Sequence, residues 1–122
     1  MRLLVATDGS THADRAVKVA ARLAGELRAV EVTLINVGQM PPAALISPGV
    51  VGHASFASLE QALERDSRGI LHHGMDAFAG TELQVARLYR SGDPATEIVR
   101  AACEEKADMI VIGARGWACS AA

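Results

Sequence analysis

The fold is decided by one stretch near the end of the sequence, Asp108-Met109-Ile110-Val111-Ile112-Gly113-Ala114-Arg115-Gly116. An unbroken apolar run, preceded by an acid and closed by glycine, is typical of a strand buried on both faces in a parallel sheet that helices cover on each side. The run opens into Gly-Ala-Arg-Gly, where glycine lets the backbone approach a ligand and leaves amide hydrogens for an anion. Because ligands of open α/β sheets bind beyond the carboxyl ends of the strands, this loop is a candidate binding site.

Three more strands and three helices are predicted before this stretch. Short β-rich or apolar runs predict strands over Arg2–Ala6, Glu31–Val37 and Leu83–Tyr89, the last more polar, as edge strands often are. Helices are predicted from near His12 to about Leu27, from Ser55 or Ser58 to about Ala79, and from Pro94 to about Lys106. The order β-α-β-α-β-α-β predicts an open parallel sheet with helices on both faces, a Rossmann-like α/β fold of one domain over residues 1–122.

Local signals set the expected helix boundaries. Thr11 and Asp14 have the spacing of a capping box, and Asp93 followed by Pro94 suits an N-cap and a first helical position. Residues 39–54 are rich in proline and glycine and predict an irregular loop. The apolar stripe expected on the first helix is Ala16, Ala20, Leu23 and Leu27, flanked by Val17 and Ala24.

Composition excludes several classes of protein. Half of the 122 residues are apolar and only 3% are aromatic, which suits an aliphatic core of helices on a parallel sheet. The formal net charge is −2 with no basic cluster, so neither nucleic acid nor an anionic membrane is an expected partner. No apolar run approaches the roughly 20 residues of a membrane span, and a strand that already includes Leu3 leaves no room for a signal peptide. Two cysteines without metal-ligand spacing fit a reducing compartment, so a cytoplasmic protein is expected.

Most established nucleotide and hydrolase motifs are absent. The sequence has no Gly-x-x-x-x-Gly-Lys-Ser/Thr, no Gly-x-Gly-x-x-Gly after its first strand, no acidic cluster of the response-regulator type and no Gly-x-Ser-x-Gly. The loops Thr7–Thr11 and Gly113–Gly116 could each place an anion at a helix N-terminus, an effect of about 0.3–1 kcal/mol from the dipole. Asp8 suits a nucleotide binder, but Asp-Gly-Ser is also ordinary turn sequence, and spacing alone favours the turn.

Histidine and cysteine predict no metal or catalytic site. His72 and His73 are adjacent on a predicted helix and point in different directions, so both are expected on the solvated surface. His12 is interpreted as a residue of the capping turn. Cys103 falls near the apolar face of the third helix and is expected in the protein core, and nothing near Cys119 marks it as a reactive thiol.

Four segments together resemble the universal stress protein family. They are residues 3–10 (Leu-Leu-Val-Ala-Thr-Asp-Gly-Ser), 34–37 (Leu-Ile-Asn-Val), 92–98 (Gly-Asp-Pro-Ala-Thr-Glu-Ile) and 107–116 (Ala-Asp-Met-Ile-Val-Ile-Gly-Ala-Arg-Gly). They follow the order and spacing of the family over nearly the whole chain, and the combination is specific although each segment alone is not.

The resemblance implies an ATP site between the first and fourth strands. The Asp8 carboxylate would lie near the base or ribose, and Val37 would meet the adenine edge through its backbone. Mg²⁺ or Mn²⁺ is implied only as a companion of ATP, without a metal site of its own. By resemblance the adenosine is bordered by Ala6, Thr7 and Asp8, and the phosphate loop begins with Ile112, Gly113, Arg115 and Gly116.

One part of the family pattern does not appear in the sequence. The family's phosphate loop reads Gly-x-x-Gly, nine residues, then Gly-Ser or Gly-Thr, and leads to a helix and a fifth strand. Gly113 and Gly116 match, but the second half would fall at positions 126 and 127, beyond Ala122. We expect a weakened phosphate site and a missing fifth strand; losing two hydrogen bonds to charged groups would weaken affinity about a hundredfold or more. A naturally short protein and a shortened product remain open as explanations.

Without a fifth strand, residues 109–112 would form an open apolar edge, which predicts a homodimer or an edge-mediated oligomer. Three functions stay open. The first is a non-enzymatic stress-response regulatory protein with an ancestral ATP site. The second is an interaction module that binds no nucleotide. The third is a weak ATPase or nucleotidyl-group enzyme on the same fold. Only Asp8, His12 and Arg115 are candidate groups for it, and no pair of them forms a recognisable catalytic device.

Overall fold

The strands of this computed structural model, which describes residues 1–39 and 53–113, form one parallel sheet with the order β3-β2-β1-β4. Among the described residues no helix has the length and apolar character needed to cross a bilayer. The predicted α/β fold and element order are confirmed, whereas the predicted 39–54 loop lies almost wholly outside the described residues. The elements are β1 (Arg2–Ala6), α1 (Thr11–Glu26), β2 (Glu31–Gly38), α3 (His53–Met75), the 3-10 turn η1 (Asp76–Phe78), β3 (Gln84–Ser91), α4 (Pro94–Glu104) and β4 (Met109–Ile112).

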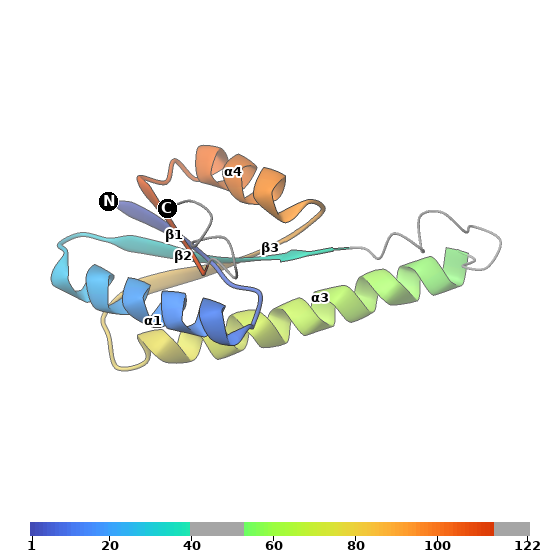
Figure 1. Cartoon of the computed structure of the whole chain (residues 1–122), viewed down its shortest axis with the longest axis horizontal. Helices are drawn as coiled ribbons and strands as arrows, with labels where there is room; N and C mark the ends of the chain where they lie inside the picture. Colours follow the sequence, from blue (N-terminus) through green and yellow to red (C-terminus); the bar gives the residue numbers. More distant parts are fainter. Residues whose placement is uncertain (40–52, 114–122) are drawn as a thin grey trace.

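Helices cover both faces of the sheet. Figure 1 shows α1 and α3 on one face and α4 on the other. Alternation along β1 sends Leu3 and Val5 into the core under α1 and α3, and Leu4 and Ala6 into the smaller core under α4. β1 is therefore buried on both faces, and each large aliphatic side chain fully removed from water stabilises the fold by about 1.5–3 kcal/mol.

β4 differs from the expectation of a strand buried on both faces. Met109, Ile110 and Ile112 are 39%, 39% and 52% exposed, because within the described ranges β4 pairs only with β1. Val111 alone is packed against the core beneath α1 and α3. The prediction that residues 109–112 form a strand buried on both faces is therefore wrong. The prediction that they form an open apolar edge agrees with their observed exposure.

The first helix begins one residue earlier than the capping box predicted. Ser10 is the N-cap, and its hydroxyl accepts the Ala13 amide at 3.1 Å, so Thr11 already lies inside α1. The buried face is also rotated from the predicted stripe: Leu27 is exposed, and Ala16 and Leu23 are only half-buried. The residues that α1 buries are Ala13, Val17, Ala20, Ala21 and Ala24.

The other helix boundaries were predicted to within a few residues. α3 begins at His53 rather than at Ser55 or Ser58, and α4 ends at Glu104 rather than near Lys106. Asp93 caps α4 as predicted, accepting the Thr96 amide at 3.0 Å.

The prediction that Cys103 lies in the core is wrong, since its side chain is exposed on the outer side of α4.

Candidate functional site

The carboxyl ends of three strands meet at one edge of the sheet. In the register of the sheet, Ala6 at the end of β1 lies opposite Ile35 of β2 on one side and Ile112 of β4 on the other. The strand order thus brings together the predicted site residues of three separate segments. Six of them are described and lie at this edge, whereas Arg115 and Gly116 lie outside the described residues; the six are Ala6, Thr7, Asp8, Val37, Ile112 and Gly113.

Three of these residues present apolar side chains on the same face. Ala6 and Ile112 are register partners, and Val37 follows Ile35 by two residues, so all three point to the face that carries α4. Ala6 is 7% exposed and packs in the α4 core, where Val37 is half-buried, while Ile112 is 52% exposed. The strand ends therefore offer an apolar floor with its outer part open.

The turn between β1 and α1 is fixed by side chains of its own sequence. The Thr7 hydroxyl accepts the Gly9 amide at 3.2 Å, and an Asp8 carboxylate oxygen accepts the Ser10 amide at 2.9 Å. Gly9 has φ of +80°, which favours glycine, and a Cβ there would lie 3.1 Å from a side-chain carbon of Ile70. The turn is thus packed against α3, and the exposed Asp8 carboxylate is held at its rim.

Gly113 brings the end of β4 directly against the first turn of α1. A Cβ at Gly113 would lie 2.7 Å from the carbonyl oxygen of His12 and 2.8 Å from the Ala13 backbone. No side chain fits in that space without a shift of the main chain. The segment that begins the predicted phosphate loop therefore starts beside the N-terminus of α1, an end that favours negative charge.

Asn36 is a residue of this edge whose role the sequence did not reveal. It is 5% exposed, and its side-chain amide donates to the Thr7 carbonyl at 2.8 Å. Its signal was visible as the one amide in the apolar run Leu34–Val37, because a buried polar side chain in such a run needs a specific partner. Ser10 was likewise present in the quoted motif, but its capping role was assigned to Thr11.

The described residues contain no cluster of three or more His, Cys, Asp or Glu side chains placed to hold a metal. His73 lies 3.3 Å from an Asp14 oxygen and 4.0 Å from an Asp76 oxygen, and His72 and His73 are both exposed, as predicted. His12 is exposed in the first turn of α1. The arrangement at the strand ends is thus suited to binding by backbone amides, an apolar floor and one carboxylate.

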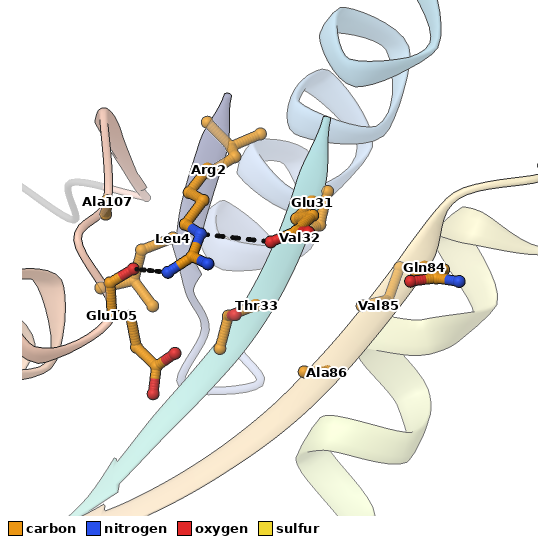
Figure 2. Close-up of a pocket in the computed structure, with 11 residues that line it drawn as sticks. Arg2, Leu4, Glu31, Val32, Thr33, Gln84, Val85, Ala86, Glu105 and Ala107 are labelled. Carbon is orange, nitrogen blue, oxygen red and sulfur yellow. Dashed lines mark hydrogen bonds and ion pairs between the residues drawn. The ribbon is translucent and has the colours of Figure 1, made fainter. Parts of the chain in front are cut away.

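A hollow of about 390 Å³ lies at the opposite, amino-terminal edge of the sheet. Figure 2 shows the Arg2 side chain between Glu31 and Glu105. The Arg2 guanidinium lies 3.2 Å from the Glu31 carboxylate and donates to the Glu105 carbonyl at 2.9 Å. The Arg2 charge is therefore neutralised by Glu31. The hollow also lies at the opposite edge from the strand carboxyl ends, where ligands of such sheets bind.

A sequence profile described as the universal stress protein family matches residues 1–118. A Thermus aquaticus protein, the universal stress protein in the QAH/OAS sulfhydrylase 3' region, is 37% identical over 115 residues, which are 93% of this chain and 77% of that protein. Universal stress protein YxiE of Bacillus subtilis is 29% identical over 118 residues, covering 94% of this chain and 79% of that protein.

Solved structures share the fold. A universal stress protein family member from Burkholderia pseudomallei superposes with a TM-score of 0.74 at 25% identity, over 96% of this chain and 83% of the other. An Arabidopsis thaliana family protein with AMP bound gives a TM-score of 0.69 at 16% identity, over 95% and 78% of the two chains. A universal stress protein in complex with cAMP gives 0.62 at 21% identity, over 90% and 69%.

Proposed function

Because the chain belongs to the universal stress protein family, we propose that it binds an adenine nucleotide at the carboxyl ends of β1, β2 and β4. The observation that carries this proposal is the register of the sheet, in which Ala6 of β1 lies between Ile35 of β2 and Ile112 of β4. This register gathers the predicted nucleotide-binding residues at one edge of the sheet. Two structures of similar fold contain AMP and cAMP, which supports adenine nucleotides as the class of ligand.

The proposed binding mode follows from the side chains at that edge. A planar purine would lie on the apolar floor of Ala6, Val37 and Ile112, with the Val37 backbone at its edge. The Asp8 carboxylate, at the rim of the turn, would accept a hydrogen bond from a ribose hydroxyl or the base amine.

The phosphates of the nucleotide would extend towards Gly113 and the N-terminus of α1. Arg115 and Gly116 would continue the phosphate contacts. With ATP as the nucleotide, Mg²⁺ or Mn²⁺ would be held mainly through the phosphates.

The proposed role is that of a cytoplasmic regulatory protein of the stress response. We favour a binding role over a catalytic one because no pair among Asp8, His12 and Arg115 forms a recognisable catalytic device in the sequence. The nucleotide would then act as a regulatory ligand, and a partner protein or a second copy of the chain would bind differently to the occupied and the empty site.

Isothermal titration calorimetry of the full chain with AMP, cAMP and ATP tests the proposal. Asp8→Ala should weaken binding about tenfold or more, since a hydrogen bond to a charged group contributes about 1.5–3 kcal/mol. Glu26→Ala, an exposed acid at the far end of α1, is the matched control and should bind as the unmodified chain does. Failure of all three nucleotides to bind at millimolar concentration would exclude this function.

A second candidate is an interaction module that binds no nucleotide. It is favoured by one observation, the exposure of Met109, Ile110 and Ile112 on β4. Absence of nucleotide binding together with self-association would support it. Phosphate release from ATP that is lost in Asp8→Ala would instead support a weak ATPase.

A further inference from the structure

The end of β2 directs its peptide groups alternately towards its two neighbours. The Thr7 amide donates to the Ile35 carbonyl at 3.0 Å, on the β1 side, and the Gly92 amide donates to the Gly38 carbonyl at 3.0 Å, on the β3 side. Because alternate residues of a strand face opposite neighbours, the peptide groups of Val37 face the β1 side, as those of Ile35 do.

β1 leaves the ladder at this point. In a continued parallel ladder the Thr7 carbonyl would accept the Val37 amide, two residues beyond Ile35. The strand ends at Ala6 instead, and the Thr7 carbonyl accepts the side-chain amide of Asn36 at 2.8 Å. A side chain from β2 thus provides the donor that the β2 backbone would have provided.

Asn36 holds this position from beneath the sheet. It is 5% exposed on the face of Leu34, the face covered by α1 and α3, and hence opposite to the floor formed by Ala6, Val37 and Ile112. An amide buried in such a core costs free energy unless it is hydrogen-bonded, whereas an aliphatic residue would fill the same space without that cost. The residue is therefore explained by its bond to Thr7.

We infer that Asn36 is a positioning residue for the adenine site. By holding the Thr7 carbonyl it turns the chain out of the ladder, so that the peptide edge of Val37 faces a ligand in the gap between β1 and β2. Asn36 acts through Thr7 and does not touch the nucleotide. This inference rests on the proposed adenine-nucleotide function and adds to it the residue that sets base recognition.

The test compares Asn36→Leu, which has no donor, with Phe78→Leu, a change in the hydrophobic core on the same face of the sheet. Two quantities are measured for each full-length variant. One is hydrogen exchange of the Gly9 and Ser10 amides without ligand. The other is the affinity for AMP and for inosine monophosphate, whose base has a carbonyl oxygen where adenine has an amino group.

Asn36→Leu should speed hydrogen exchange at Gly9 and Ser10 about tenfold and weaken AMP binding about tenfold, in line with the loss of one hydrogen bond. The ratio of the affinities for AMP and inosine monophosphate should fall close to one. Phe78→Leu should lower stability and leave the preference unchanged. Asn36→Ala, which adds no bulk, should show the same changes as Asn36→Leu and serves if that variant does not fold.

Unchanged exchange at the turn, or an unchanged preference between the two bases, would overturn the inference. A native chain that binds neither nucleotide would overturn the proposed function and the ligand part of this inference. Faster exchange in Asn36→Leu would even then support Asn36 as the residue that holds the turn.

Discussion

At Gly113, directly after β4, the main chain passes so close to α1 that even a methyl group would meet backbone atoms of His12 and Ala13, at 2.7 and 2.8 Å. We predict that Gly113→Ala lowers the free energy of unfolding by about 1–3 kcal/mol, because overpacking against backbone is relieved only by moving an element. Urea denaturation measures the change. Gly69→Ala is the matched control: nothing lies within 4 Å of its added methyl, so it should stabilise α3 by about 0.5–1 kcal/mol. If Gly113→Ala left the stability unchanged, the backbone at Gly113 would have to lie further from His12 and Ala13 than these distances indicate.

Tyr89 is the only tyrosine of the chain, so its ionisation can be followed by ultraviolet absorbance. Burial first, then the charges of Glu64 and Glu60, raises its pKa above the ordinary 10.0. Because the folded state holds the phenol proton more tightly, this contribution to stability is present below pH 10 and is lost as the pH rises through the folded-state pKa. We predict that Glu64→Gln lowers the pKa of Tyr89 but leaves it above 10.0, since burial remains. Glu82→Gln should leave the titration unchanged, and an equal shift in both variants would argue against a local effect of Glu64.

At the scale of single elements, α4 depends on its N-cap. An Asp93 oxygen accepts both the amide and the hydroxyl of Thr96, and these bonds, the amide bond first, lower the pKa of Asp93 below its ordinary 3.8. The capping contribution is therefore fully present above the unfolded-state pKa and is lost as the pH falls through the lower folded-state value. We predict that Asp93→Ala lowers stability at neutral pH and flattens the acid limb of the profile, measured by thermal unfolding from neutral to acidic pH. Asp93→Asn should retain the cap but not the titration; a normal acid limb in Asp93→Asn would assign that limb to another carboxyl.

The same elements show how far sequence alone could reach. Asp93 and Pro94 predicted the start of α4 because capping chemistry is local. The bounds of β1 were also predicted, because a short aliphatic run lies there between Arg2 and Thr7. Ser10 was missed in favour of Thr11, since both have a hydroxyl and only the backbone path decides which one caps. The exposure of Cys103 depends on how α4 is rotated over the sheet, a tertiary property that the apolar stripe of an eleven-residue helix does not determine.

At the scale of the whole molecule, the candidate site is a product of strand order. Ala6, Val37 and Ile112 are far apart in sequence and meet only because β1 lies between β2 and β4. Spacing could not predict that meeting, whereas the resemblance to the family could, because a family carries its topology with its motifs. The bond from Asn36 to Thr7 was beyond both, since it depends on which face of β2 each residue takes.

The open edge of β4 leads to the last prediction, which concerns association of whole molecules. Apolar strand edges pair with other chains, and Ile110 is 39% exposed on the strand that lacks an outer partner within the described residues. We predict that the full chain sediments as a dimer or larger species at tens of micromolar, and that Ile110→Lys shifts it to monomer, because a lysine at the edge must be desolvated when another strand pairs there. Val99→Lys removes a side chain that is 58% exposed but lies on α4, away from the edge, and should leave association unchanged. A clean monomer of the unmodified chain would exclude pairing through β4, and equal loss of association in both variants would point to general apolar contact in place of strand pairing.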